Sequence, residues 1–136
     1  MKIALDAFGS DNAPVPEVEG AVQSIRDNHC ECVYLVGKED ILKKELEKYY
    51  YDTKRIILVN AAEVISMSDE PSVSARSKKD SSLVKALQLH KSGEADAVVS
   101  AGNTGAVMAA SLFYLGRVKN ILRPAIALTL PTHSNF

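Results

Sequence analysis

The chain has no tryptophan, and aromatic side chains make up only 6% of its 136 residues. Its apolar content is therefore mainly aliphatic, which is typical of parallel strands covered by helices. The formal net charge is −1, so no basic field indicates nucleic acid as a partner. No apolar run reaches the ~18 residues of a membrane-spanning helix. Because a strand-like segment begins at Lys2, we expect no signal peptide and a cytoplasmic location.

Cysteine is scarce, and the two that are present, Cys30 and Cys32, lie two positions apart and next to His29. Side chains at this spacing share one face of a strand, but such neighbours rarely form a disulfide. Three candidate ligands on one short stretch are too few for a typical metal site. We therefore expect reduced structural cysteines and no metal ion. The remaining histidines, His90 and His133, are expected to be packing or surface residues.

Strand and helix patterns alternate along the chain, which predicts an α/β fold with a doubly wound, mainly parallel sheet and helices on both faces. A single domain over residues 1–136 accommodates the whole pattern. The expected strands cover residues 3–6, 33–36, 55–59, 97–100 and 125–130. The expected helices cover residues 16–27, 39–50, 81–92 and 106–112, with Asp80 as an N-cap and Gly93 as a stop signal.

Two further expectations follow from this pattern. Residues 60–77 form an irregular stretch, and a loop of that length in a compact domain is often functional. A parallel sheet that stops after five strands leaves an apolar edge, so we expect chains to associate.

The most informative segment is residues 98–106, VVSAGNTGA. It reads as a strand, a tight turn with Gly102 and Gly105, and the start of a helix. Backbone N–H groups and the helix dipole at such a turn attract an anion, with phosphate as the natural candidate. An ordinary strand-to-helix turn, in which the glycines only permit close packing, is the alternative.

Two other loops are expected at the same edge of the sheet, because ligands of such folds bind at the carboxyl ends of the strands. One covers residues 6–14 and the other residues 74–82, which carry Arg76, Lys78 and Lys79. Cations beside helix N-termini can hold a phosphate dianion, but they can equally form a solvated charge run.

The other polar residues of these loops have structural interpretations as well. Asp6 and Asp11 can be turn residues, and Ser81 and Ser82 can cap a helix. The spacing fits no catalytic Ser-His-Asp or Cys-His arrangement, and the glycines fit neither common nucleotide-binding pattern. The residues alone therefore indicate an anion-binding α/β protein.

Four segments together resemble the signatures of the PlsX family of fatty acid/phospholipid synthesis proteins, the phosphate acyltransferases. They are residues 6–14 (DAFGSDNAP), 74–82 (SARSKKDSS), 95–106 (ADAVVSAGNTGA), and 123–125 (RPA) followed by 129–132 (TLPT). Their order is that of the family, and they extend over nearly the whole chain.

The resemblance implies transfer of a long-chain acyl group from acyl carrier protein to inorganic phosphate, giving acyl phosphate for phospholipid synthesis without a cofactor. It implies a fold similar to that of phosphotransacetylases and of the isocitrate/isopropylmalate dehydrogenase group. It also implies a cytoplasmic homodimer that makes peripheral contact with the membrane. Family chains are roughly twice as long, so residues 1–136 correspond to the N-terminal part of the family sequence.

The resemblance and the chemistry of acyl transfer suggest roles for the loop residues. We expect Asn103, Lys79 and Asp11 to act in catalysis, with Asn103 donating to the carbonyl oxygen, Lys79 binding phosphate and Asp11 orienting its loop or moving a proton. Asn12 replaces a histidine that is usual in the family, and an amide has no usable pKa for proton transfer. Phosphate and substrate contacts are expected from Gly9, Ser10, Asn12, Lys78, Ser81, Ser82, Gly102, Thr104 and Gly105.

Two other functions stay open at this point. A phosphotransacetylase that uses coenzyme A would need the same anion site with a short acyl group. A truncated, non-catalytic chain would bind phosphate or acyl carrier protein without turnover.

Overall fold

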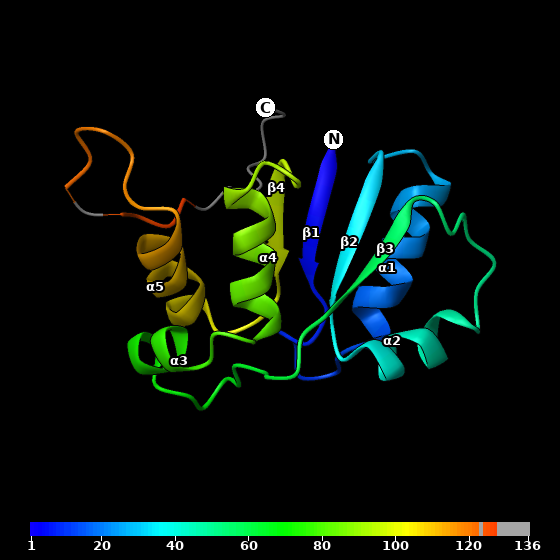
Figure 1. Ribbon diagram of the computed structural model, residues 1–136, viewed down its shortest axis with the longest axis horizontal. Coiled ribbons are helices and arrows are strands. Elements are labelled where there is room, and N and C mark those ends of the chain that lie inside the picture. The colour runs from blue at the N-terminus through cyan, green and yellow to red at the C-terminus, as the bar shows by residue number, and fades with distance from the viewer. Residues whose placement is uncertain (123, 128–136) are drawn as a thin grey trace, which may run out of the picture.

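The computed structural model describes residues 1–122 and 124–127 of the chain. Strands and helices alternate through most of it (Figure 1). In chain order they are β1 (Lys2–Asp6), α1 (Val15–Arg26), β2 (Cys32–Gly37), α2 (Glu39–Leu46), β3 (Ile56–Asn60), α3 (Pro71–Ser77), α4 (Ser82–Lys91), β4 (Ala97–Ser100) and α5 (Thr104–Tyr114).

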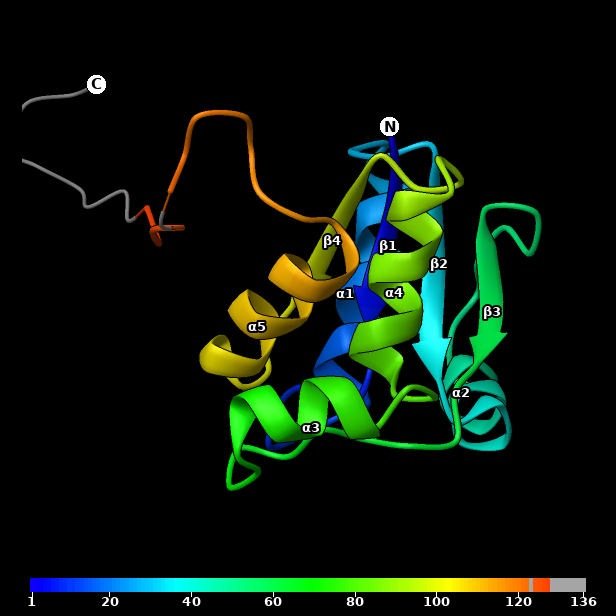
Figure 2. The same ribbon diagram turned by 60° about the vertical axis from the view of Figure 1, so that its left-hand side comes forward.

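The four strands form one all-parallel sheet in the order β3-β2-β1-β4. β1 lies in the interior of the sheet, where Leu5 pairs with Leu35 of β2 on one side and with Val99 of β4 on the other. All strands end at the same edge, which is the lower edge in Figures 1 and 2. The mainly parallel α/β fold predicted from the sequence is thereby confirmed.

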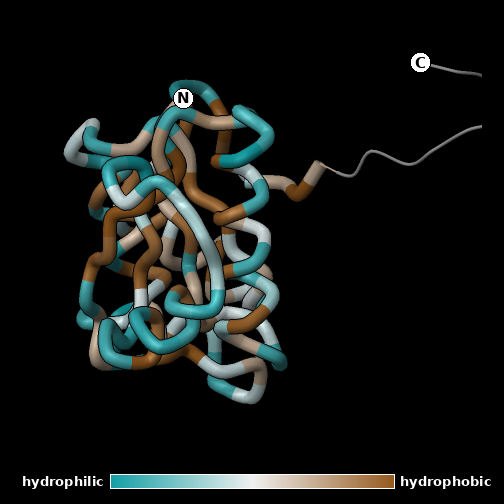
Figure 3. Tube along the Cα trace, turned by 90° about the vertical axis from the view of Figure 1, so that its right-hand side faces the viewer, coloured by the Kyte–Doolittle hydropathy of each residue, from teal (hydrophilic) through white to brown (hydrophobic). Residues whose placement is uncertain are grey.

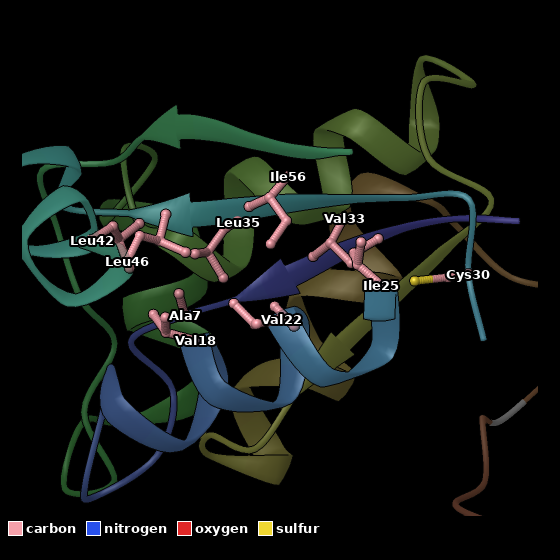
Figure 4. Packing of buried hydrophobic residues seen from close by; sticks show 11 residues of the cluster. Ala7, Val18, Val22, Ile25, Cys30, Val33, Leu35, Leu42, Leu46 and Ile56 are labelled. Atoms are coloured by element: carbon pink, nitrogen blue, oxygen red, sulfur yellow. The ribbon is translucent and has the colours of Figure 1, made fainter. Parts of the chain in front are cut away.

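Helices cover both faces of this sheet. α1 and α2 pack on one face, where Val18, Val22 and Ile25 of α1 meet Val33 and Leu35 of β2 (Figure 4). α4 packs on the other face against small residues such as Ala4, α5 lies beside α4, and α3 packs mainly against α5 (Figure 2). Because the sheet is buried on both faces, its strands are nearly continuous in apolar residues, while hydrophilic loops lie at the ends of the strands (Figure 3).

The chain leaves β1 and β4 toward opposite faces of the sheet. α1 follows β1 on one face, and α5 follows β4 on the face that carries α4. Such a reversal between neighbouring strands opens a crevice at their carboxyl ends, where ligands of doubly wound folds bind. The loop over residues 7–14 and the turn over residues 101–103 follow these two strands at that edge of the sheet.

Several helix boundaries that the sequence predicts differ from those in the structure, each for a physical reason. The stretch over residues 60–77 is not wholly irregular, because α3 begins at Pro71, where proline suits a first turn and the Glu70 carboxylate accepts from the N–H groups of Ser72 and Val73. α2 ends at Leu46, four residues early, because the chain turns at Glu47 and Lys48. The N-cap of α4 is Ser81 rather than Asp80, since Ser81 Oγ accepts from Val84 N.

The expected end of α4 agrees with the structure. Gly93 has a φ of +81°, which glycine adopts readily, and it follows the end of α4 as expected.

The strand expected over residues 125–130 was wrong for its first three residues, because residues 125–127 are not in a strand. Residues 128–130 lie outside the described residues.

Candidate functional site

A buried carboxylate joins the ends of β1 and β4. Asp6 is only 3% exposed; its Oδ2 accepts from Ser100 Oγ at 2.7 Å, and its Oδ1 accepts from Phe8 N at 3.3 Å. Ser100 Oγ in turn accepts from Gly102 N at 3.1 Å. These three hydrogen bonds fix the turn after β4 to the loop after β1.

Two glycines allow the same two segments to touch. A Cβ atom added to Gly9 would lie 2.8 Å from Asp6 Oδ2 and 2.9 Å from Gly102 N, and one added to Gly102 would lie 3.1 Å from Gly9 Cα. A side chain at Gly9 would force its neighbours to shift, and one at Gly102 would fit only if its neighbours gave way by a few tenths of an ångström. The structure thus brings together the first and third sequence motifs, as expected for a shared site.

The N-terminus of α5 opens onto this junction. Asn103 is its N-cap, and Asn103 Oδ1 accepts from Ala106 N at 3.0 Å. Within residues 1–122 and 124–127, the backbone N–H groups of Thr104 and Gly105 have no acceptor. Such unpaired N–H groups at the positive end of a helix are suited to an anion.

The Asn103 side chain also reaches a second loop. Its Nδ2 atom donates toward the carbonyl oxygens of Ser66, Met67 and Asp69 at 3.2–3.4 Å. The expectation that this amide donates to a substrate carbonyl therefore faces competition from three backbone acceptors. Asn103 links the turn after β4 to the segment that leads into α3.

Glycine permits a second close approach at this end of α5. A Cβ atom on Gly105 would lie 2.9 Å from Pro71 Cγ, at the start of α3. The segment before the second motif is thereby held against the third motif.

The three cations of the second motif differ in their surroundings. Lys78 Nζ bonds to Asp69 Oδ2 at 2.5 Å and to Val64 O at 2.8 Å. The exposed Arg76 guanidinium lies over the Phe113 ring, 4.3 Å from its centre. The exposed Lys79 makes no side-chain hydrogen bond or ion pair with the described residues. Of these three cationic side chains, Lys79 is therefore the most available to a ligand.

The serines at the start of α4 are buried. Ser81 and Ser82 are 0% and 2% exposed, and Ser81 Oγ caps the helix while Ser82 N donates to Glu63 O at 3.3 Å. Their direct contact with phosphate stays a prediction, and their observed role is to hold the first turn of α4. Asp80 accepts from Ala62 N and pairs with Lys85, which ties the segment after β3 to α4.

The first loop presents polar side chains around Gly9. Asp11 and Asn12 are exposed. Ser10 Oγ is buried and has no hydrogen-bond partner among the described residues. A buried hydroxyl without a partner is uncommon and is available to a ligand. Neither the Ser10 feature nor the Asp6–Ser100 bond could be read from spacing alone.

Carboxylates of the segment before α4 have lowered pKa values. The hydrogen bond from Lys78, followed by that from Ser66 N, lowers the pKa of Asp69. The Val73 N–H and the Ser72 hydroxyl lower the pKa of Glu70, and Lys85 lowers that of Asp80. Each of these groups therefore binds its proton less readily in the folded chain than in the unfolded chain.

This gives a prediction for acid stability. A carboxyl with a lowered folded pKa contributes stability above its unfolded pKa and loses that contribution as pH falls through the folded value. We expect hydrogen exchange of residues 62–80 to accelerate below about pH 4, before the sheet opens, and Asp69→Asn to weaken this pH dependence. Glu19→Gln, at an exposed position of α1, is the matched control, and equal effects of the two changes would contradict the prediction.

Cys30 and Cys32 are both buried and free, and burial raises the pKa of the Cys32 thiol. No group of three or more His, Cys, Asp or Glu residues is placed to hold a metal ion within residues 1–122 and 124–127. In the same residues, no helix has the length and apolarity needed to cross a membrane.

These features define a class: a doubly wound α/β protein in which the loop after β1 meets the turn after β4 at the N-terminus of α5. The whole chain, residues 1–136, matches the family model described as fatty acid synthesis protein, and the chain belongs to that family. The resemblance inferred from the four motifs is thereby confirmed.

Relatives in several bacteria carry the name phosphate acyltransferase. The chain is 51% identical to that of Dictyoglomus turgidum over 132 residues, which is 97% of this chain and 39% of the relative. It is 51% identical to that of Fusobacterium nucleatum over 131 residues, or 96% and 40% of the two chains. It is 46% identical to that of Clostridioides difficile over 131 residues, or 96% and 38%. The chain thus spans about two-fifths of the length of these relatives.

Proposed function

We propose that this chain provides the phosphate-binding part of a phosphate acyltransferase, which moves a long-chain acyl group from acyl carrier protein to inorganic phosphate. The observation that carries the proposal is the unpaired first turn of α5, fixed to the loop after β1 in a chain whose relatives are named phosphate acyltransferase. The family description, fatty acid synthesis protein, supports a fatty acyl group as the transferred group. The product, acyl phosphate, would serve phospholipid synthesis.

The geometry suggests how the phosphate is held. The N–H groups of Thr104 and Gly105 lie at the positive end of α5 and have no acceptor among the described residues. We infer that the exposed Lys79 reaches the same phosphate and adds a positive charge. The Ser10 hydroxyl is next in the chain to Gly9, which touches the same turn. Together these groups form a dianion site that requires no metal.

The reaction needs few further groups. A phosphate oxygen attacks the thioester carbonyl carbon, a carbon–oxygen bond forms, and the carbonyl oxygen becomes an oxyanion. The carbon–sulfur bond then breaks, the thiolate of the carrier leaves, and the thiolate takes a proton from solvent. Backbone N–H groups aimed at the developing charge lower the barrier. Asp6 and Asn103 position the two segments that carry these donors, and Asp11 and Asn12 are exposed on the loop after β1.

The activity is tested in a complete enzyme and in the chain alone. We suggest a chimera in which this chain replaces the matched 132 residues of the Dictyoglomus turgidum relative. Hydroxylamine traps acyl phosphate formed from palmitoyl-acyl carrier protein and phosphate. Phosphate-dependent hydroxamate from the chimera is expected, and its absence from a folded chimera would contradict the proposal.

The same assay separates the alternatives. Preference for acetyl-coenzyme A over palmitoyl-acyl carrier protein would identify a phosphotransacetylase. If the isolated chain binds phosphate but forms no acyl phosphate, the chain binds its substrate without catalysing the reaction alone.

Lys79 provides a specific test of the phosphate site. Lys79→Ala in the chimera is expected to raise the KM for phosphate about tenfold, the effect of losing roughly 1.4 kcal/mol of charge-assisted binding, with a smaller change in the KM for the acyl carrier. Lys44→Ala, at an exposed position of α2, is the control. An unchanged phosphate dependence of Lys79→Ala would remove Lys79 from the site.

A further inference from the structure

The loop that joins β3 to α3 is held in place mainly by polar bonds. It runs along the lower edge of the molecule toward α3 (green in Figure 1). Of residues 62–70, all of which the structure describes, only Ile65 is buried, and it packs in the same apolar cluster as Ala106 of α5. Since one buried side chain cannot fix a loop of this length, the position of the loop beside α5 depends on its hydrogen bonds.

Asp69 connects this loop to two helices. Its Oδ2 atom accepts from Lys78 Nζ, at the end of α3, at 2.5 Å and from Ser66 N at 2.8 Å. Its backbone carbonyl accepts from Nδ2 of Asn103, the N-cap of α5, at 3.3 Å. The carboxylate of Asp69 therefore fixes the loop to α3, and the carbonyl of the same residue contacts the start of α5.

The folded loop decides which way the Asn103 amide faces. Asp69 N donates to Ser66 O at 3.2 Å, and Ser66 N donates to Asp69 Oδ2, so the two residues close the loop into a turn. This turn presents three carbonyl oxygens to Asn103 Nδ2, those of Ser66, Met67 and Asp69. Because an amide nitrogen donates and does not accept, these acceptors hold Nδ2 toward the loop and leave Oδ1 for Ala106 N.

We propose that Asp69, through its bond to Lys78, is a positioning residue for phosphate at the start of α5. The fixed loop holds the Asn103 amide as the N-cap, and the cap keeps the first turn of α5 in the shape that offers the N–H groups of Thr104 and Gly105 to an anion. Without the carboxylate the loop leaves α5, the amide rotates, and the first turn loses this shape. The inference rests on the proposed function, because it takes the start of α5 as the phosphate site.

The test measures phosphate directly, in the chimera described above and in the chain alone. Asp69→Asn is expected to raise the Kd for inorganic phosphate, measured by calorimetry, and the KM for phosphate about fivefold each, with a smaller change in kcat. A merely structural loss would reduce the amount of folded enzyme, and therefore kcat, without moving the KM or the Kd. Glu45→Gln on α2 is the matched control, because Glu45 also pairs with a lysine, Lys48, but has no bond to α5.

Lys78 distinguishes positioning of the loop from direct contact with phosphate. Lys78→Met is expected to raise the Kd for phosphate as much as Asp69→Asn does, and the double variant is expected to resemble either single variant, because all three lack the same bond. Lys78→Arg keeps a charged donor for Asp69 and is expected to keep the Kd near that of the unmodified protein. Additive effects of Lys78→Met and Asp69→Asn would show that Asp69 does not act through Lys78 and would overturn the proposal.

Hydrogen exchange of the chain alone tests the hold of the loop on α5 without phosphate or turnover. In Asp69→Asn the Ala106 amide is expected to exchange about tenfold faster, while exchange in β1 and β2 changes little. Unchanged exchange of Ala106, or an unchanged Kd for phosphate, would overturn the proposal even if the chimera transfers acyl groups. If phosphate binding depends on Asp69 but the folded chimera forms no acyl phosphate, the positioning role is supported and the proposed reaction is contradicted.

Discussion

Gly9→Ala is expected to destabilise the chain by about 3 kcal/mol and to disrupt the candidate site at the same time. The added methyl group would lie within 3.0 Å of three atoms: Asp6 Oδ2, Gly102 N and Ser100 Oγ. All three atoms take part in hydrogen bonds of this junction, since Ser100 Oγ donates to Asp6 Oδ2 and accepts from Gly102 N. Because Gly102 N is a backbone atom, the methyl group is accommodated only if the loop after β1 moves away from the turn after β4. Urea unfolding of the purified chain measures the loss.

Gly20→Ala is the matched control for this change. Gly20 lies within α1, and a Cβ atom there meets nothing within 4 Å. Alanine in an exposed helix interior should therefore stabilise the chain by about 0.5–1 kcal/mol. Opposite signs for the two Gly→Ala changes would support the close junction at Gly9. A stability of Gly9→Ala equal to that of the unmodified chain would show that the two loops do not touch.

The fold was predictable because its signals are local. Runs such as Val33–Val36 and the repeated apolar positions of α1 define strands and helices within a few residues of chain. The parallel sheet then follows from the alternation of the two elements. α3 escaped prediction because its segment is rich in serine and acidic residues, and its helix depends on capping by Glu70 and on packing against α5.

The site was predictable as a set of loops but not as a set of contacts. The glycine turn and the loop after β1 could be assigned to one edge of the sheet from topology alone. The bond between Ser100 and Asp6 joins residues 94 positions apart, and no spacing rule identifies such a partner. For the same reason, sequence could not distinguish Lys78, which Asp69 engages, from Lys79, which is exposed.

Asn103→Asp is expected to cost about 2 kcal/mol of folding free energy and to loosen the segment before α3. Aspartate keeps the acceptor that caps Ala106 N. It also replaces the Nδ2 donor by a carboxylate oxygen that faces the carbonyl oxygens of Ser66, Met67 and Asp69. Hydrogen exchange of residues 66–71 is therefore expected to accelerate, while exchange in β1 and β2 changes little.

Asn103→Ser separates the two roles of the Asn103 amide, which are capping α5 and donating to the loop over residues 66–69. Serine retains a cap for α5 but has no group that reaches the second loop, so a smaller loss of about 1 kcal/mol is expected. Asn120→Asp, at an exposed position, controls for the added charge. If Asn103→Asp leaves exchange of residues 66–71 unchanged but lowers kcat in the chimera, the amide donates to the substrate carbonyl. If exchange and kcat change together, the amide acts on the reaction by positioning the loop, because the segment that it holds borders the anion-binding turn.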